Sequence, residues 1–207
     1  MKNLFITFEG GEGSGKTTQI QLLAGHLRRE GRTVLTTREP GGTRIGDAIR
    51  ELLLDSTLSE MSDRAEALLY AASRAQLVDE VIKPALAEDK VVICDRYIDS
   101  SVAYQAFARG LDREAVENIS LWATGNLLPD LTFLLKIPAE KGLFRAITGE
   151  ADRIEREEIT FHEQVEAGYN RLAAENPLRF RIIEAAADIE LVHARIAEIV
   201  DLKLKAG

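Results

Sequence analysis

The stretch that decides the fold is Gly10-Gly11-Glu12-Gly13-Ser14-Gly15-Lys16-Thr17, which follows the apolar run Leu4–Phe8. It fits the pattern G-x-x-x-x-G-K-[ST], in which a glycine-rich loop joins a strand to a helix. Glycines let successive backbone N–H groups turn inward around phosphate oxygens, and the helix start adds its positive end. The alternative is a glycine turn with no ligand. We predict that the whole loop binds a nucleoside triphosphate, through Gly10, Gly11, Glu12, Gly13, Ser14, Gly15, Lys16 and Thr17.

Two oxygen-bearing side chains are candidates for a magnesium site beside this loop. In a loop of this kind the lysine, here Lys16, bridges the β- and γ-phosphates, and the hydroxyl of Thr17 ligates Mg²⁺. Asp95 directly follows the apolar run Val91–Cys94, so it is expected at the end of a neighbouring strand. We predict Asp95 as the second magnesium-side group, acting through water. A structural cap at the strand end is the alternative for this aspartate.

Apolar runs alternate with helical patterns along the chain. The expected strands are Leu4–Phe8, Thr33–Thr37, Val91–Cys94, Leu131–Ile137 and Phe180–Ile183. The expected helices include Thr17–Glu30, Ile45–Leu53, Asp63–Ala87, Arg113–Gly125 and Glu157–Glu175. This alternation predicts an α/β fold, with a five-stranded parallel sheet wrapped by helices and ligands at the carboxyl ends of the strands.

The length of 207 residues predicts a single domain, spanning residues 1–207. One dense charge run, Gly149–Glu158, interrupts the helical patterns. It is either the solvated start of a helix or part of a mobile lid with a glycine hinge. We place a small lid at about residues 140–160 on the second interpretation.

Charge and cysteine content limit the class of partner. The formal net charge is -8, which argues against a duplex nucleic acid or an anionic membrane as the main partner. No segment approaches the about 18 continuous apolar residues of a membrane span. The single cysteine, Cys94, ends a strand-like run and predicts a reducing compartment, so we expect a cytoplasmic protein.

Three further segments carry a family resemblance. They are Arg38-Glu39-Pro40-Gly41-Gly42-Thr43 with Ile49-Arg50, then Leu68–Gln76, and then Asp95–Gln105. Together with Phe8-Glu9-Gly10 and the Asp-Arg-Ile-Glu stretch at Asp152–Glu155, they closely resemble the bacterial thymidylate kinase family over about residues 3–175. The resemblance implies a P-loop nucleotide-kinase fold and a homodimer. It also implies transfer of the γ-phosphoryl group of ATP, with Mg²⁺, to thymidine 5′-monophosphate (dTMP), giving dTDP and ADP for dTTP synthesis.

The same resemblance implies how the acceptor nucleotide is held. Arg50 and Arg96 look like clamps on its 5′-phosphate, because a guanidinium fork fixes the geometry of a dianion. Tyr70 stands where the family usually has phenylalanine and would stack on thymine. Arg74 is similar to the arginine that donates to a thymine carbonyl, and Tyr104 to the ring beneath the sugar. Each could singly be an ordinary core or surface residue. The remaining acceptor-site residues implied are Glu12, Glu39, Ser101 and Gln105.

For the chemical step, the resemblance implies Lys16, Arg96 and a lid arginine as catalytic residues. Arg153 is the first candidate to reach the transferring phosphoryl group, with Arg156 second, since the loop itself carries no arginine. Arg145, at the start of the lid, is expected to stack on adenine.

Three departures from the family pattern concern local structure. The stretch Ala106-Phe107-Ala108-Arg109-Gly110 replaces a glycine-rich loop, so a stiffer and bulkier loop is expected there. Lys136 replaces the usual aspartate at the end of the fourth strand. The lid between Gly142 and Gly149 is short and carries only Arg145 where relatives often carry several arginines.

Two other functional classes fit the phosphate loop alone. One is a kinase for another nucleotide or for a nucleoside, and the other is a nucleotide-binding switch without an acceptor. Arg74 and the Ser101–Gln105 cluster argue against the first. Arg50, Arg96 and a lid arginine argue against the second.

Overall fold

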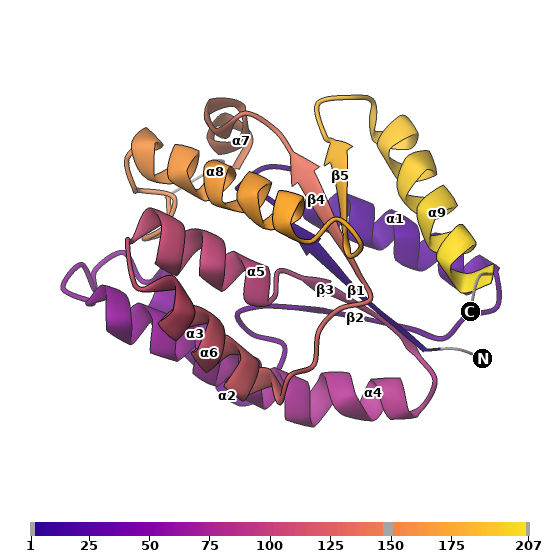
Figure 1. Ribbon diagram of the computed structural model, residues 1–207, viewed down its shortest axis with the longest axis horizontal. Coiled ribbons are helices and arrows are strands. Elements are labelled where there is room, and N and C mark those ends of the chain that lie inside the picture. Colours follow the sequence, from indigo (N-terminus) through magenta and orange to yellow (C-terminus); the bar gives the residue numbers. More distant parts are fainter. Residues whose placement is uncertain (1–2, 147–150, 206–207) are drawn as a thin grey trace.

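The computed structural model describes residues 3–146 and 151–205, in which a parallel sheet lies between layers of helices (Figure 1). Its strands are β1 (Leu4–Glu9), β2 (Val34–Arg38), β3 (Val91–Asp95), β4 (Leu131–Lys136) and β5 (Phe180–Glu184). Their order across the sheet is β2-β3-β1-β4-β5, and every neighbouring pair is parallel. The predicted α/β class and the five-stranded parallel sheet are confirmed, with each expected run within one residue of its strand at either end.

The helices connect these strands and cover both faces of the sheet. The α-helices are α1 (Lys16–Arg29), α2 (Arg44–Leu54), α3 (Asp63–Leu77), α4 (Lys83–Ala87), α5 (Ile98–Ser101), α6 (Arg113–Thr124), α7 (Ala139–Ala146), α8 (Ile159–Glu175) and α9 (Ile189–Lys205). Two wider π-helical turns, η1 (Val78–Ile82) and η2 (Val102–Ala108), continue α3 and α5. No helix among the described residues is long and apolar enough to cross a membrane.

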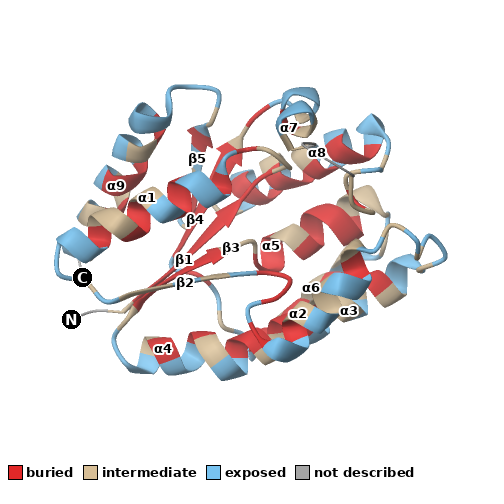
Figure 2. Cartoon of the chain, turned by 180° about the vertical axis from the view of Figure 1, so that it is seen from behind, coloured by how far each residue is buried: buried red, intermediate tan, exposed pale blue. Residues whose placement is uncertain are grey.

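Strand β1 is buried on both faces, which explains why its sequence is an unbroken apolar run. Leu4, Ile6 and Phe8 pack in one cluster with α1 and α9. The alternate residue Phe5 packs on the opposite face, in a cluster with η1 and α4. Figure 2 shows this central strand buried between the helical layers.

The site is set by the carboxyl ends of the central strands. β1 lies between β3 and β4, and the register places Phe8 opposite Asp95 of β3. The glycine loop that follows β1 therefore begins beside the end of β3. Ligands of open α/β sheets bind at this kind of position, where strand order reverses.

Two stretches differ from the expected structure because of wide helical turns. The expected helix Asp63–Ala87 is interrupted at η1, where Lys83 N–H donates to the carbonyl of Val78, five residues earlier. Pro84 follows directly, and a proline ring clashes with the carbonyl four residues before it in a regular α-helix. The wide turn ahead of Pro84 accommodates that ring.

The second difference lies after Gln105, where a bulky loop was expected. The expectation of a loop was wrong, because residues 102–108 form the π-helical turn η2. The Arg109 N–H donates to the Tyr104 carbonyl, five residues earlier, at 2.9 Å. The bulk is present, because Phe107 of η2 packs against Gly168 of α8. A residue with a side chain at position 168 would collide with that ring.

We predict that Gly168→Ala lowers the free energy of unfolding relative to Gly25→Ala, a matched glycine inside α1. A β-carbon at position 168 would lie 2.8 Å from Cδ2 of Phe107 and 3.0 Å from its Cβ. Overpacking of this kind costs about 1–3 kcal/mol. At position 25 the nearest atom would be 3.5 Å away, so alanine should gain up to about 1 kcal/mol of helix stability. Denaturant unfolding of both variants measures the difference, and equal stabilisation would contradict the packing.

Candidate active site

The phosphate loop needs glycine at three positions because of its backbone. Gly10, Gly13 and Gly15 have φ angles of 139°, 62° and 87°, which residues with a side chain rarely adopt. Gly13 also lies against the lid helix α7, where a β-carbon would overlap the carbonyl of Gly142. The loop and α7 therefore meet backbone to backbone.

Lys16 lies inside the loop. Its Nζ donates to the carbonyls of Gly10 and Gly11, both at 3.0 Å, and to Oγ of Ser14 at 3.3 Å. Burial, and then repulsion from Arg96, hold the pKa of Lys16 below its ordinary value. The ammonium group is thus centred on the loop and desolvated.

Thr17 and Asp95 place two oxygens side by side at the loop. Thr17 Oγ1 donates to Oδ2 of Asp95 at 3.2 Å, so the two predicted magnesium-side residues are neighbours. Both are hard oxygen donors, which suits Mg²⁺ bound by few protein groups together with phosphates and water. In the described ranges, no group of three His, Cys, Asp or Glu residues could hold a metal by itself.

Arg96 joins the loop to two other parts of the fold. Its Nη1 donates to the Gly10 carbonyl at 3.0 Å and to the Tyr169 hydroxyl of α8 at 3.1 Å. Its Nη2 donates to Oε1 of Glu12 at 2.6 Å. The backbone of Arg96 has a φ of 68°, a left-handed conformation that is costly for a residue with a side chain. From this backbone conformation the guanidinium reaches back to the Gly10 carbonyl of the loop.

Glu12 remains a charged group in this setting. Besides Arg96 it accepts a hydrogen bond from the Tyr104 hydroxyl at 3.1 Å. Burial raises the pKa of Glu12, but Arg96, Lys16 and the Tyr104 hydroxyl outweigh burial and hold it below its ordinary value. The guanidinium of Arg96 also lies over the Tyr104 ring, 5.1 Å from its centre.

A buried acid, Glu9, binds two of the side chains that contact Arg96. It accepts from the backbone N–H of Tyr97 at 2.8 Å, from Ser100 Oγ at 2.6 Å and from the Tyr169 hydroxyl at 3.0 Å. Burial, followed by repulsion from Asp99, raises the pKa of Glu9 to about 8. Ser100 and Tyr169 in turn accept from Arg96, so Glu9 fixes two partners of that guanidinium.

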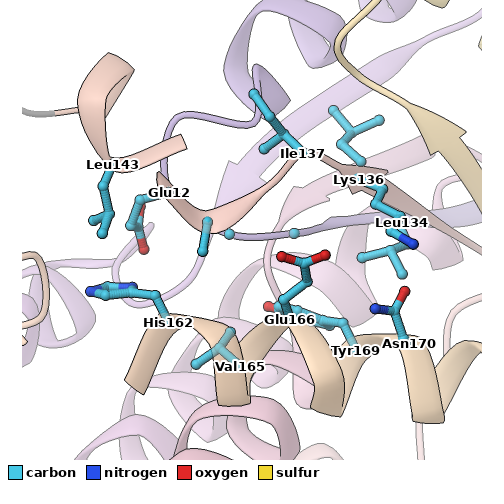
Figure 3. A pocket seen from close by; sticks show the side chains of 14 residues that line it. Glu12, Leu134, Lys136, Ile137, Leu143, His162, Val165, Glu166, Tyr169 and Asn170 are labelled. Atoms are coloured by element: carbon cyan, nitrogen blue, oxygen red, sulfur yellow. The ribbon is translucent and has the colours of Figure 1, made fainter. Parts of the chain in front are cut away.

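A small cavity lies behind the loop, between β4 and α8. Figure 3 shows the carboxylate of Glu12 directed toward the ring of His162, with Leu143 of α7 beside them. Lys136, one of the departures from the family pattern, lines the other end of this cavity. Burial lowers the pKa of His162 more than Glu12 raises it, so the ring is neutral at pH 7. Glu12 therefore keeps Arg96 as its ionic partner.

Two further cavities meet in front of the loop. One is an open cleft of about 780 Å³ beside the phosphate loop, lined also by Asp95. The other is a narrower pocket between α3, η2 and the segment after the lid. The residues that line both are Glu12, Glu39, Arg50 and Arg96. Two arginines therefore stand where groups bound in the two cavities would meet.

The second pocket gathers most residues predicted for the acceptor. Tyr70, Ser101, Tyr104 and Gln105 line it, together with Arg50, whose Nη1 donates to the Pro40 carbonyl at 3.1 Å. Burial, and then Glu66, raise the pKa of the Tyr70 hydroxyl above its ordinary value, which keeps that ring neutral.

Arg74 lies behind this pocket and does not line it. Its side chain is 1% exposed, and its Nε donates to Oε2 of Glu39 at 2.7 Å. Its Nη2 donates to Ser101 Oγ at 2.9 Å. Burial raises the pKa of Glu39 to about 7, although Arg74 opposes the shift. Arg74 therefore reaches the pocket wall through Ser101 and Glu39.

One lid arginine lies beside the phosphate loop, and the two others line a different cavity. Arg145 lines the cleft beside the phosphate loop. Arg153 and Arg156 line a separate cavity, and Nη1 of Arg153 pairs with Glu66 at 2.7 Å. Arg153, predicted to reach the transferring group, is thus not brought to the cleft. Residues 147–150 of the predicted lid lie outside the described residues.

Sequence reasoning missed several residues that build this site. Glu9 and Tyr169 lie far apart in sequence, and no local pattern joins them. Glu66 had a usable signal, because Glu66, Tyr70 and Arg74 recur every four residues and so share one face of α3. A polar stripe on a buried helix face indicates a site.

A central strand that ends in a phosphate loop, with arginines shared between that loop and a second pocket, defines a P-loop nucleotide kinase. A family model described as Thymidylate kinase matches residues 8–196. The chain belongs to the thymidylate kinase family.

Individual relatives agree with this assignment. A thymidylate kinase of Bacillus licheniformis is 45% identical over 99% of this chain and 98% of its own length. One of Pelotomaculum thermopropionicum is 50% identical, over 100% of this chain and 99% of its own. The crystal structure of thymidylate kinase from Ehrlichia chaffeensis has a TM-score of 0.81 at 31% identity, covering 97% of this chain and 100% of that one.

We predict that Lys16→Ala keeps the fold and loses nearly all phosphoryl transfer. The lysine is desolvated and repelled by Arg96, so its removal should leave the melting temperature close to that of the wild type. Loss of one charged donor from a preorganised site costs about 10²–10³ in kcat or more. Lys203→Ala, on the exposed face of α9, is the control. Turnover near the wild-type rate in an ADP-release assay would remove Lys16 from the mechanism.

Proposed function

We infer that this thymidylate kinase family member transfers the γ-phosphoryl group of ATP to dTMP, giving dTDP and ADP. The observation that carries this is the boundary between the two cavities. The loop around Lys16 suits the donor phosphates on one side, and the pocket under Tyr70 and Tyr104 suits a nucleoside on the other. Arg50 and Arg96 line both cavities, where the acceptor phosphate would face the donor.

The chemistry requires alignment and charge neutralisation more than proton transfer. An oxygen of the acceptor phosphate attacks the γ-phosphorus in line, and that oxygen already carries negative charge. Lys16 neutralises charge on the donor, while Arg50 and Arg96 orient the acceptor with guanidinium forks. Because these groups are held by the fold before substrate binds, they stabilise the transition state without rearranging.

Thr17 and Asp95 are proposed to hold Mg²⁺, the Thr17 hydroxyl directly and Asp95 through water. When bound, Mg²⁺ neutralises charge on the β- and γ-phosphates. Asp95 also positions Thr17 by accepting its hydroxyl hydrogen at 3.2 Å.

The acceptor base is proposed to lie in the pocket lined by Tyr70 and Gln105, with the sugar over Tyr104. The Tyr70 ring stacks on thymine, and Tyr104 crowds a ribose 2′-hydroxyl, which favours deoxyribose. Glu12 binds near the 3′-hydroxyl of the sugar. Arg74 acts on the base edge through Ser101 and Glu39, which it holds in place.

Arg145 is the lid arginine best placed to reach the transferring phosphoryl group. It lines the cleft beside the loop, and its helix α7 touches the loop at Gly13 and Gly142. Arg153 is held in a separate cavity by Glu66. This arrangement favours Arg145 over Arg153 for the role that the sequence assigned to Arg153.

The chain is proposed to act as a cytoplasmic homodimer. Several large apolar side chains are exposed on the helical layer of α2, α3 and α6: Ile45 (49%), Leu52 (48%), Leu68 (56%) and Trp122 (85%). An apolar set of this kind supports an interface with a second copy. The net charge of -8 supports a role without nucleic acid.

A panel of acceptors tests the proposed function. We predict the highest kcat/KM with dTMP, a lower but measurable value with deoxyuridylate, and the lowest with deoxycytidylate. Loss of the thymine methyl costs about 1–3 kcal/mol. Cytosine brings a donor where thymine has a carbonyl, which leaves a buried polar group unpaired. Coupled ADP release measures all three.

Three outcomes of the panel would contradict the proposal. A preference for another monophosphate or for thymidine would indicate a different acceptor. ATP hydrolysis that no acceptor accelerates would indicate a switch. Equal kcat/KM for dTMP and deoxycytidylate would show that the pocket does not distinguish thymine from cytosine.

Arg145→Ala should lower kcat by about 10²–10³ while the KM for ATP and for dTMP changes little, because the contact forms mainly in the transition state. Arg195→Ala, an exposed arginine on α9, is the control. If kcat is unchanged and only the ATP KM rises, Arg145 is a ground-state contact, as adenine stacking would be.

A further inference from the structure

A single buried carboxylate, Glu66, joins three segments of the chain behind the acceptor pocket. It is 1% exposed and lies in the first turn of α3. Its Oε1 accepts from Gln105 Nε2 at 2.9 Å. Its Oε2 accepts from Arg109 Nη2 at 3.1 Å and pairs with Arg153 Nη1 at 2.7 Å.

These donors come from the two walls of the acceptor pocket. Gln105 lines the pocket itself and belongs to η2. Arg153 lies between Asp152 and Ile154, which both line the pocket from the opposite segment. Both walls are therefore tied to one carboxylate on α3.

The segment that contains Arg153 has a second attachment, to the end of α2. Arg153 Nε donates to the Leu53 carbonyl at 2.9 Å, and its backbone N–H donates to the Leu54 carbonyl at 3.3 Å. Leu54 is itself a pocket residue. Arg153 thus holds the segment beside the pocket, and it lines a cavity other than the phosphate cleft.

The two arginines of this cluster, Arg109 and Arg153, differ in how many acidic side chains they pair with. Arg109 has three acidic neighbours, Glu66, Asp63 and Glu157. Arg153 is 10% exposed, and Glu66 is its one ionic partner among residues 3–146 and 151–205. Burial raises the pKa of Glu66, but Arg109 and Gln105 outweigh it and keep the carboxyl ionised. A nearly buried guanidinium without its partner is unfavourable, so Arg153 depends on Glu66.

We propose that Glu66 is a positioning residue for the acceptor nucleotide: through Gln105 and Arg153 it sets the spacing of the two walls that enclose the base. It touches neither substrate. The inference rests on the proposed function, because it assumes that this pocket receives the acceptor. It assigns Arg153 to acceptor binding and leaves the donor side untouched.

The test is Glu66→Gln, measured as separate KM values for dTMP and ATP and as kcat. Glutamine keeps the size and a hydrogen bond but removes the charge that holds Arg153. The dTMP KM should rise by at least about tenfold, because a small displacement of the residues that position a substrate can weaken its binding by this much or more. The ATP KM should stay within about twofold, since the cleft beside the phosphate loop shares no residue with this cluster. A dTMP KM that does not rise, or an equal rise in both KM values, would overturn the proposal.

Glu175→Gln is the matched control. Glu175 also pairs with two arginines, Arg113 and Arg171, but on the surface at the end of α8. Both KM values and kcat should remain at the wild-type level. A selective rise in the dTMP KM of this control would show that any lost arginine pair has the effect, and would overturn the assignment to Glu66.

A double-mutant cycle with Arg153→Met separates positioning from a fold defect. The pair Glu66→Gln with Arg153→Met removes both charges, so it should fold even if Glu66→Gln alone does not. Its dTMP KM should be no higher than that of the worse single variant, because the two residues act as one unit. Additive effects would contradict that coupling. A fall in kcat for Arg153→Met with an unchanged dTMP KM would place Arg153 on the transferring group instead.

Activity of the wild type and the KM of the Glu66 variant separate a wrong acceptor from a wrong role for Glu66. If the wild type does not phosphorylate dTMP, the proposed function falls. If the wild type is active and Glu66→Gln has an unchanged dTMP KM, only the role of Glu66 falls.

Discussion

The site depends on the hydrogen bonds that the Arg96 guanidinium makes to three parts of the fold. The guanidinium binds the Gly10 carbonyl of the phosphate loop, the Glu12 side chain and the Tyr169 hydroxyl of α8. The loop that follows β1 is thereby joined to the end of β3 and to the helix that follows the lid. The left-handed backbone of Arg96 costs free energy, and the N–H of that residue donates to the Phe8 carbonyl at 2.9 Å, which fixes the strained turn. A strained residue held from several sides is typical of a functional site.

The charges around Arg96 follow from this geometry. Arg50 and Arg96 line both cavities, and Lys16 lines the cleft beside the loop, so three positive groups lie where phosphates would bring negative charge. Glu12 keeps its charge and balances Arg96, while Glu9 supports it through Ser100 and Tyr169. The positive groups are therefore aimed before substrate binds, which is the condition for electrostatic catalysis of phosphoryl transfer.

The sheet and the phosphate loop could be predicted from the sequence because both depend on local patterns. A strand buried on both faces has a continuous apolar run, and Gly10, Gly13 and Gly15 have φ angles that favour glycine. The same reasoning failed where structure depends on distant partners. Arg153 does not line the phosphate cleft because it pairs with Glu66, and the pairing of these two distant residues has no local signal. The wide turn η2 was also missed, and its Phe107 packs against Gly168 of α8, a contact between residues far apart in sequence.

The most direct test of the account is a crystal structure with dTMP and a non-hydrolysable ATP analogue bound. The account predicts acceptor phosphate oxygens at about 2.7–2.9 Å from the guanidinium nitrogens of Arg96 and Arg50. It also predicts that the γ-phosphate lies on the loop around Lys16, with its phosphorus in line for attack by one of these acceptor oxygens. An acceptor phosphate bound elsewhere, with Arg96 still in contact only with Gly10, Glu12 and Tyr169, would contradict it.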